Sequence, residues 1–181
     1  ACCTWYGCGA DQAFPSALNS IVSNRPFCEY AGTVRTYSFL APAAGSARLI
    51  YHEHVMEHIT ALQGAFCLKD WFRLLGPGGV LRVATPDLQY VIERYGGDWK
   101  DQAWLRLPEY QFIETRAEMI NVSLRWWGHQ YLYDGEELER RMREAGFATV
   151  RRCGYGESAV GELAGLETRP DSMLILEAVR P

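Results

Sequence analysis

Residues 71–88 read WFRLLGPGGVLRVATPDL, and they contain the end of one expected helix, a turn and a complete expected strand. The run Gly76-Pro77-Gly78-Gly79 is predicted to stop the helix, because proline lacks the amide hydrogen that a helix interior needs and glycine readily adopts a positive φ. Val80–Ala84 is a short apolar run typical of a buried strand. Asp87 then has the side chain of an N-cap for a helix over 88–95.

The segments on either side continue this alternation. Upstream, 48–51 has the composition of a buried strand, and the apolar residues of 55–75 recur at helical spacing. Downstream, Asp134 is expected to cap a helix that Gly146 ends. The expected elements there are a helix over 135–145, a strand over 147–153, a short helix over 161–166 and a closing strand over 173–179. Strands that alternate with helices predict an α/β fold with a parallel sheet and crossover helices.

The composition is that of a folded domain, with 181 residues of which 48% are hydrophobic and 22% charged. No apolar run approaches the roughly 20 residues of a membrane-spanning helix, which predicts no membrane partner. The net charge is -4 and the 18 Lys and Arg residues are interleaved with acids, which argues against a nucleic-acid partner. The densest basic run, residues 140–143, lies among glutamates and is interpreted as a solvated helix face.

The organisation of the chain predicts a single domain over residues 1–181. Residues 1–45 are atypical, because they are rich in Cys, Ala, Ser and Pro and show weak periodicity. Residues 98–130 are dense in aromatic side chains and are expected to form a lid or insertion over the sheet edge. The six cysteines are interpreted as reduced thiols, and no export signal precedes them, so we expect a cytoplasmic protein.

Three ordered motifs lie in the central part of the chain. They are YHEHVMEHI at 51–59, WFRLLGPGGVLR at 71–82 and TPDL at 85–88, and related segments follow at 127–134, 144–147, 156–158 and 166–169. Residues 46–181 therefore resemble the class I S-adenosylmethionine-dependent methyltransferases, in particular their small type-11-like branch. The resemblance implies a Rossmann-like three-layer sandwich with a mostly parallel, seven-stranded sheet and an antiparallel last strand. It also implies S-adenosylmethionine as the cofactor.

The expected cofactor site begins near the start of the chain, where Gly7-Cys8-Gly9 is similar to a Gly-Cys-Gly loop of that family. Glycines let the backbone approach the methionine part of the cofactor, and an acid about 20 residues later accepts hydrogen bonds from the ribose hydroxyls. Glu29 stands at that spacing. The resemblance adds His54, in the segment that lines the cofactor pocket after a strand. Residues 11–24 depart from the family because they lack a clear helical pattern.

Two histidines are the catalytic candidates. His129 follows Trp126-Trp127-Gly128 at the mouth of the expected lid, and an imidazole with a pKa of roughly 6.5 can act as a general base at neutral pH. The alternative for His129 is a hydrogen bond that fixes the lid. His58 is the second catalytic candidate, with capping or packing as its alternative.

Three functions compete on this evidence. The first is methyl transfer to a small-molecule or sugar-containing acceptor. The second is a metal-using hydrolase-type enzyme, in which His52, His54 and His58 bind a divalent metal. The third is a non-catalytic remnant that forms a homodimer through an unpaired sheet edge.

Overall fold

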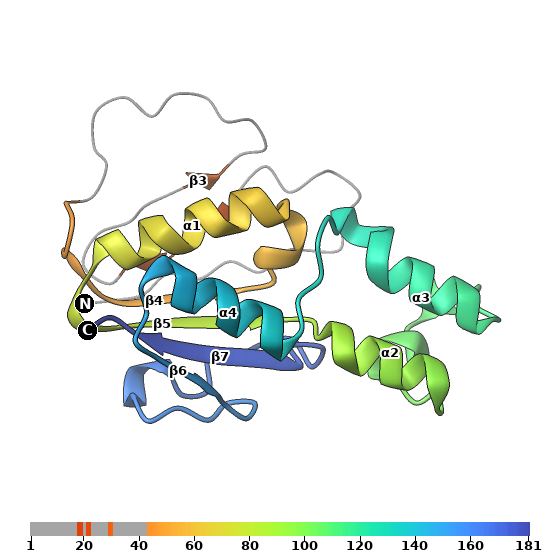
Figure 1. The fold of residues 1–181 in the computed structure, drawn as a ribbon. Helices are drawn as coiled ribbons and strands as arrows, with labels where there is room; N and C mark the ends of the chain where they lie inside the picture. The colour runs from red at the N-terminus through yellow and green to blue at the C-terminus, as the bar shows by residue number, and fades with distance from the viewer. Residues whose placement is uncertain (1–17, 20, 23–28, 31–42) are drawn as a thin grey trace.

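The computed structural model describes residues 18–19, 21–22, 29–30 and 43–181 of the chain, and its centre is a five-stranded sheet (Figure 1). The strand order is β2-β4-β5-β7-β6. The strands span Ile21–Val22 (β2), Ala47–Glu53 (β4), Leu75–Thr85 (β5), Thr149–Arg152 (β6) and Leu174–Val179 (β7). A separate two-stranded sheet pairs β1 (Leu18–Asn19) with β3 (Glu29–Tyr30).

The directions of the strands confirm the expected fold class. Strand β4 pairs with β5 in parallel, whereas β7 lies between β5 and β6 and runs antiparallel to both. Strands β4, β5 and β6 therefore share one direction, and the last strand of the chain is the inserted antiparallel one. At the other edge, β2 pairs antiparallel with β4. Dimerisation through a sheet edge stays a prediction.

Helices cover one face of this sheet and an extended segment covers the other. The α-helices are α1 (Ala61–Leu74), α2 (Leu88–Gly96), α3 (Arg116–Arg125) and α4 (Gly135–Ala145). Helices α1 and α4 lie side by side over one face, and residues 153–173, with the short 3-10 helix Gly161–Leu163, lie over the opposite face (Figure 1). No helix among the described residues is long and apolar enough to cross a membrane.

Apolar side chains from successive strand positions fill two cores, because neighbouring strand residues point to opposite faces. The core under α1 and α4 includes Ile50, Leu68, Trp71, Leu81, Val83, Leu138, Met142, Leu174 and Leu176. The core under residues 153–173 includes Leu49, Tyr51, Val80, Ala84, Leu163 and Ile175. Residues 49–51 of β4 and 80–84 of β5 are buried on both faces of the sheet, and they are apolar except for Arg82, as expected for central parallel strands.

The segment expected to be one helix over 55–75 has a different structure. A 3-10 helix, η1, spans Met56–His58, and α1 begins only at Ala61. Thr60 and Gln63 form a capping box, in which the Gln63 amide donates to the Thr60 hydroxyl at 3.2 Å and the Thr60 amide donates to the Gln63 side chain at 2.9 Å. The prediction of a continuous helix was wrong, because the capping box begins a new helix at Ala61 although the apolar spacing continues across that point.

The Gly76-Pro77-Gly78-Gly79 run does end the helix, but it belongs to β5 and not to a separate turn. Its backbone is paired with the end of the chain: the Gly78 amide donates to the Arg180 carbonyl and the Arg180 amide to the Gly79 carbonyl, both at 2.9 Å. A Cβ atom at Gly79 would lie 2.8 Å from the Gly76 carbonyl oxygen, so this position requires glycine.

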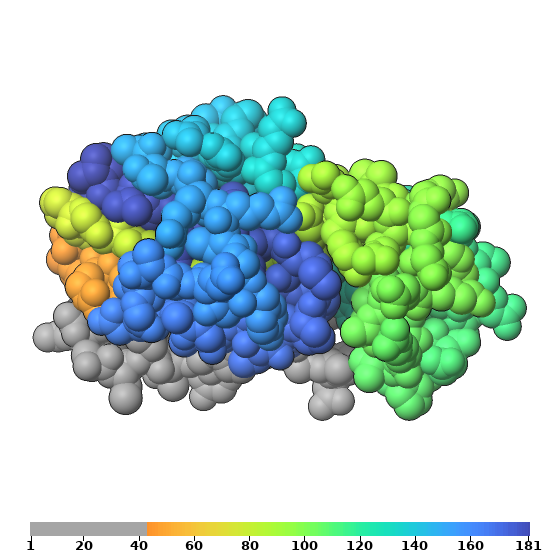
Figure 2. Space-filling view, turned by 90° about the horizontal axis from the view of Figure 1, so that it is seen from below, coloured from red at the N-terminus to blue at the C-terminus, as the bar shows by residue number. Residues whose placement is uncertain are grey.

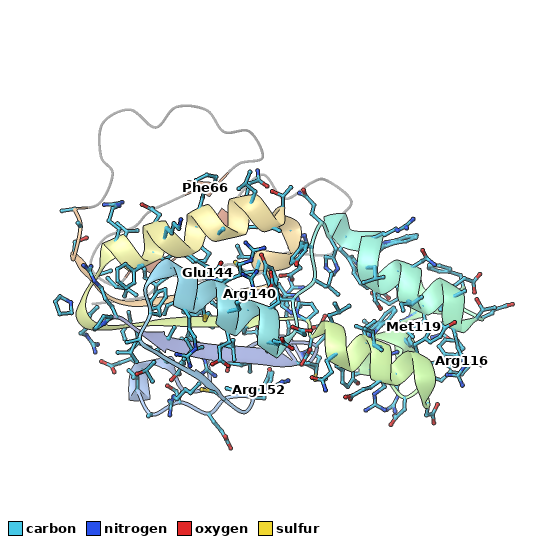
Figure 3. The ribbon with its side chains drawn as sticks, viewed as in Figure 1. Phe66, Arg116, Met119, Arg140, Glu144 and Arg152 are labelled. Carbon is cyan, nitrogen blue, oxygen red and sulfur yellow. The ribbon has the colours of Figure 1, made fainter. Side chains whose placement is uncertain are left out.

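The expected caps of two other helices are confirmed. The Asp87 carboxylate accepts from the Gln89 amide at 2.9 Å, and the Asp134 carboxylate accepts from the Glu137 amide at 2.8 Å. Gly146 ends α4 with a φ of 114°. The basic run on α4 is a solvated face, as expected, with ion pairs from Arg140 to Glu137 and Glu144, from Arg141 to Glu137 and from Arg143 to Glu139 (Figure 3).

Residues 98–130 lie together with α2 in a lobe at one side of the molecule (Figure 2). They contain the 3-10 helices η2 (Ala103–Arg106), η3 (Pro108–Tyr110) and η4 (Trp126–Gly128) together with α3. Their core consists of Trp99, Ile113, Met119 and Val122. Arg116 joins α3 to the end of α2 by donating to the Gly97 carbonyl at 2.7 Å (Figure 3). The segment therefore has a core of its own, and its role as a lid or insertion stays a prediction.

Candidate functional site

The candidate site lies where the carboxyl ends of β4 and β5 meet, which is the edge of an open α/β sheet where ligands bind. His54 directly follows the last residue of β4, and its amide donates to the Ala84 carbonyl of β5 at 2.9 Å. The backbone of His54 has a φ of 52°, a left-handed conformation uncommon for a residue with a side chain. Such strain is typical of functional sites, where the surrounding structure holds it in place.

A distant segment docks on η1 and brings a second histidine to this edge. The Gln130 amide donates to the Glu57 carbonyl oxygen, and the Gln130 side chain donates to the His58 carbonyl oxygen, both at 2.7 Å. The rings of His58 and His129 consequently meet edge to face, with centroids 5.0 Å apart. Trp127, two residues before His129, has a φ of 55° and is the second residue other than glycine with a positive φ among those described.

The carboxylate of Glu57 is the centre of the cluster, and its side chain is completely buried. Its Oε1 atom lies 2.8 Å from Nδ1 of His54 and 3.7 Å from Nε2 of His58. Its Oε2 atom accepts a hydrogen bond from the Thr85 hydroxyl at 2.9 Å. Burial alone would raise the pKa of Glu57, but His54, with help from His58 and His129, holds it at about 2. The site therefore contains a buried negative charge.

The histidines around this charge do not share one protonation tendency. Burial alone would lower the pKa of His54, but the nearby carboxylates of Glu57 and Asp171 raise it overall. For His58 and His129, burial lowers the pKa, and the opposing effect of Glu57 is too small to reverse it. His54 is thus the histidine that favours the charged form, whereas His58 and His129 favour the neutral form that can accept a proton.

The tautomer of neutral His129 follows from its contact with α3. Nδ1 of His129 lies 2.8 Å from the carbonyl oxygen of Ser123, an acceptor that requires a proton on that nitrogen. Nε2 then carries the lone pair. The hydrogen bond also joins residues 126–129 to α3, while the expected roles of His129 as a general base or in fixing a lid stay predictions.

The alternative metal site of His52, His54 and His58 is not supported by the structure. The ring of His52 packs on Trp71 with centroids 4.2 Å apart, and its burial lowers its pKa to about 3. The described residues instead bring Glu57, His58 and His129 together, with one ligand atom from each within 4.8 Å of the others. His52 points from β4 towards α1 and is buried between the sheet and that helix. His54 lies just after β4, where its left-handed backbone conformation changes the direction of the chain.

The expected cofactor loop lies outside the described residues. Gly7, Cys8 and Gly9 are in this part of the chain, and Glu29 is in β3, for which the structure describes the backbone alone. Their role stays a prediction. His54, the remaining predicted cofactor residue, lies directly after the carboxyl end of β4.

Sequence reasoning missed Glu53, the last residue of β4. Its buried carboxylate accepts hydrogen bonds from the Thr168 amide at 3.1 Å, the Arg169 amide at 3.1 Å and the Ser172 hydroxyl at 2.7 Å. These bonds hold residues 168–172 against the end of β4 and place the Asp171 carboxylate 3.6 Å from Nε2 of His54. An acid at the end of a buried strand was the available signal, but its partners lie more than 100 residues away in the chain.

Sequence reasoning also missed Arg82, in the middle of β5. Its fully buried guanidinium contacts Glu167 at 2.6 Å and Glu177 at 2.7 Å. Glu177 is its direct neighbour on β7, and the carbonyl oxygen of Glu157 accepts a further hydrogen bond at 2.9 Å. This network joins the sheet to residues 153–173. The available signals were Arg82 within the apolar run of β5 and Glu177 within the apolar run of β7.

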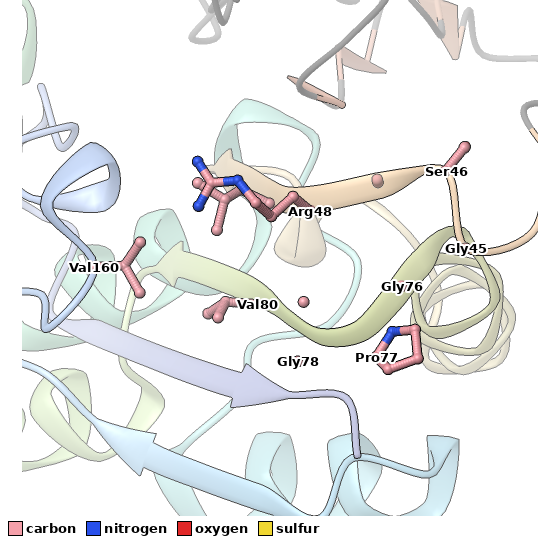
Figure 4. Close-up of a pocket in the computed structure, with 11 residues that line it drawn as sticks. Gly45, Ser46, Arg48, Gly76, Pro77, Gly78, Val80 and Val160 are labelled. Carbon is pink, nitrogen blue, oxygen red and sulfur yellow. The ribbon is translucent and has the colours of Figure 1, made fainter.

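A cavity lies at the opposite end of the strands. It has a volume of about 410 Å³ and is lined by residues near the amino ends of β4 and β5, including Arg48, Gly76 and Gly78, and by Val160 (Figure 4). None of the candidate site residues lines it. The cavity therefore contributes nothing to the histidine cluster.

Comparisons with known proteins give one family match and several structural neighbours. Residues 7–152 match a family model described as a methyltransferase domain. Among solved structures, a SAM-dependent methyltransferase from Thermotoga maritima is 17% identical, with 79% of this chain and 60% of that one covered and a TM-score of 0.44. PigF with SAH is 15% identical over 77% of this chain and 32% of that one, at a TM-score of 0.46.

A third solved structure, a SAM-dependent methyltransferase from Archaeoglobus fulgidus, is 12% identical, with 76% of this chain and 61% of that one covered and a TM-score of 0.44. The chain thus spans less than two thirds of the length of these three proteins. A search of curated proteins found no match.

Proposed function

The chain belongs to the class I S-adenosylmethionine-dependent methyltransferase family, and on this premise we propose that it transfers a methyl group from S-adenosylmethionine to a small-molecule or sugar-containing acceptor. The observation that carries the proposal is the cluster of Glu57, His58 and His129 at the carboxyl ends of β4 and β5. This is the sheet edge at which ligands bind in open α/β folds. The cluster offers a basic nitrogen there.

The cofactor site is proposed to consist of Gly7, Cys8, Gly9, Glu29 and His54. The family match starts at residue 7 and so includes the glycine loop. The structure offers a test of fit at His54, whose Nε2 atom is buried and has no hydrogen-bond partner in the described part of the chain. A buried polar atom without a partner costs free energy, so a polar group of a ligand would stabilise it. When bound, S-adenosylmethionine supplies the electrophilic methyl group.

The residues of this chain would contribute position and a proton acceptor. Methyl transfer by in-line displacement depends mainly on holding the acceptor atom in line with the methyl group. Nε2 of His129 would accept the proton that the acceptor hydroxyl or amine loses when the methyl group leaves the cofactor sulfur, with S-adenosylhomocysteine as the other product. Glu57 stabilises the imidazolium formed, because its carboxylate lies in the same cluster. His58 packs edge to face on His129 and limits its rotation.

Ligand binding tests the cofactor part of the proposal. S-adenosylmethionine or S-adenosylhomocysteine should raise the melting temperature, since a ligand at about 100 times its Kd stabilises the folded state by about 2.7 kcal/mol. His54→Ala should reduce the shift. His52→Phe is the matched control, because His52 packs on Trp71 and lies outside the cluster. Absence of a shift in folded wild-type protein at saturating ligand contradicts the proposal.

Turnover with a panel of hydroxyl and amine acceptors tests the role of His129 as a base, and the release of S-adenosylhomocysteine measures the rate. His129→Ala should retain the cofactor-induced thermal shift and lose about 10²–10⁴-fold in kcat. An unchanged kcat in this variant would remove His129 from the mechanism and leave the cofactor site untouched.

A further inference from the structure

We propose that Glu57, His58 and His129 form a binding site for a divalent transition-metal cation, for which zinc is the best match. These residues bring one carboxylate oxygen and two imidazole nitrogens within 4.8 Å of one another. The ligands come from two segments about 70 residues apart in the sequence, and hydrogen bonds from the backbone and side-chain amides of Gln130 to carbonyl oxygens of η1 hold the segments together. The site is therefore built by the fold and not by a local sequence motif.

The ligand chemistry selects the cation. Two histidines and one glutamate form a ligand set of catalytic zinc sites, in which the fourth position is left for water or substrate. Tetrahedral coordination at about 2.0–2.2 Å places the ligand atoms about 3.4 Å apart. Oε1 of Glu57 already lies 3.7 Å from Nε2 of His58. The three ligand atoms all lie within 4.8 Å of one another, so cation binding requires them to move closer together.

Two of the three ligands are oriented by a second partner, and Oε1 of Glu57 also lies 2.8 Å from Nδ1 of His54, so a bound cation would share this oxygen with His54. Nδ1 of His129 lies 2.8 Å from the Ser123 carbonyl oxygen, which leaves Nε2 for the cation. Oε2 of Glu57 accepts from the Thr85 hydroxyl at 2.9 Å, which leaves Oε1 towards the histidines. Hydrogen bonds of this kind fix the ring and carboxylate orientation of metal ligands. The side chain of His58 is 11% exposed, so a cation can enter from solvent on its side.

The cation and the proton compete for the same lone pair of His129. With the cation bound, an acceptor hydroxyl would be activated by the cation and not by a free imidazole. That role rests on the proposed function, whereas cation binding itself does not. The experiment therefore measures binding in the absence of S-adenosylmethionine.

Zinc titration of the full chain by calorimetry, with the cysteines alkylated beforehand, tests the site. Wild-type protein should bind one equivalent of zinc, and cobalt should give the visible absorption of a four-coordinate site. His58→Ala and His129→Ala should each weaken zinc binding at least about tenfold. His52→Phe should retain wild-type affinity, which separates this site from one that involves all histidines.

Two results would overturn the proposal: no one-equivalent binding by folded wild-type protein, or wild-type zinc affinity in folded His129→Ala. If an alanine variant loses its circular dichroism signal, His58→Gln and His129→Gln take its place, because they retain hydrogen-bonding capacity. The S-adenosylmethionine thermal shift is measured on metal-free protein, so failure of zinc binding and failure of cofactor binding are observed separately.

Discussion

Oε1 of Glu57 lies 2.8 Å from Nδ1 of His54, and the two side chains are 0% and 4% exposed. The two residues are three apart in sequence, and the left-handed backbone of His54 folds the chain back so that their side chains meet. The pair ties the end of β4 to η1. Because both groups are buried and titratable, their interaction makes the stability of the fold depend on pH.

The first prediction concerns this pH dependence. The pKa of His54 is raised above 6.5, so its contribution to stability is present below pH 6.5 and is lost as the pH rises through the raised value. The pKa of Glu57 is lowered from 4.5 to about 2, so its contribution is present above pH 4.5 and is lost as the pH falls towards 2. The pair therefore stabilises the fold most between pH 4.5 and 6.5.

Urea unfolding of wild-type protein and Glu57→Gln measures this. The difference in free energy of unfolding between them should be larger at about pH 5.5 than at about pH 9. Burial lowers the pKa values of His52, His58 and His129 and Glu57 opposes this, so loss of Glu57 through these residues also destabilises the variant more at the lower pH. Equal differences at the two pH values would show that the ion pair does not contribute.

The second prediction concerns the contact of α1 with Tyr133. A Cβ atom at Gly64 would lie 2.5 Å from the Tyr133 hydroxyl oxygen and 3.2 Å from Cε of Met56. Gly64→Ala should therefore destabilise the protein by about 1–3 kcal/mol through overpacking, although alanine favours a helix by about 1 kcal/mol.

Tyr133→Phe should correct this clash. The buried Tyr133 hydroxyl has no hydrogen-bond partner among the described residues, so its removal alone should be close to neutral. In the double variant the hydroxyl is gone, and the Cβ atom at position 64 lies 3.7 Å from the ring atom Cζ of residue 133. The helix preference of alanine then contributes to stability. A double-mutant cycle by urea unfolding tests the coupling, and additive effects would contradict it.

The third prediction concerns the buried arginine of β5. Arg82→Met leaves the carboxylates of Glu167 and Glu177 buried beside an apolar side chain, and should cost about 3–5 kcal/mol. The control is Arg48→Met, because Arg48 forms an exposed ion pair with Glu162 of a kind that contributes about 0–1 kcal/mol. Equal costs in chemical unfolding would mean that the buried network is not important for stability.

The fourth prediction concerns the carboxylate of Glu53. Glu53→Gln weakens the hydrogen bonds to residues 168–172 and should cost about 2 kcal/mol. Amide hydrogen exchange at Thr168 and Arg169 should become faster, because these amides lose their charged acceptor. Glu162→Gln, in an exposed ion pair, is the control and should leave both rates unchanged. Unchanged exchange in Glu53→Gln would show that other contacts hold the segment.

Much of the fold could be predicted because its signals are local. Helix α4 follows from an Asp134 cap, apolar spacing within one helix and the positive φ of Gly146, all of which act within a few residues. The boundary of α1 could not be predicted from apolar spacing, because Val55, Met56 and Ile59 continue that spacing while Thr60 and Gln63 cap a new helix. The glycine-proline run is part of β5 because its backbone forms hydrogen bonds with Arg180, a residue about 100 positions later in the sequence.

The candidate site was predicted in part. His54, His58 and His129 were recognised as candidates, but the structure does not support a grouping that includes His52. Distance along the sequence favoured the nearest histidines, whereas the structure excluded His52 through its packing on Trp71 and recruited His129 through Gln130. Glu53 and Arg82 act through partners on β7 and on residues 153–173, which no local pattern identifies.

The sequence by itself determined the alternation of strands and helices, because helix caps, glycine positions and apolar periodicity act between near neighbours. The tertiary structure alone decided that β7 enters between β5 and β6, that Glu57 is buried among imidazoles, and that His58 meets His129. These features depend on free energies of packing and burial between segments far apart in the chain, which exist only once the chain has folded.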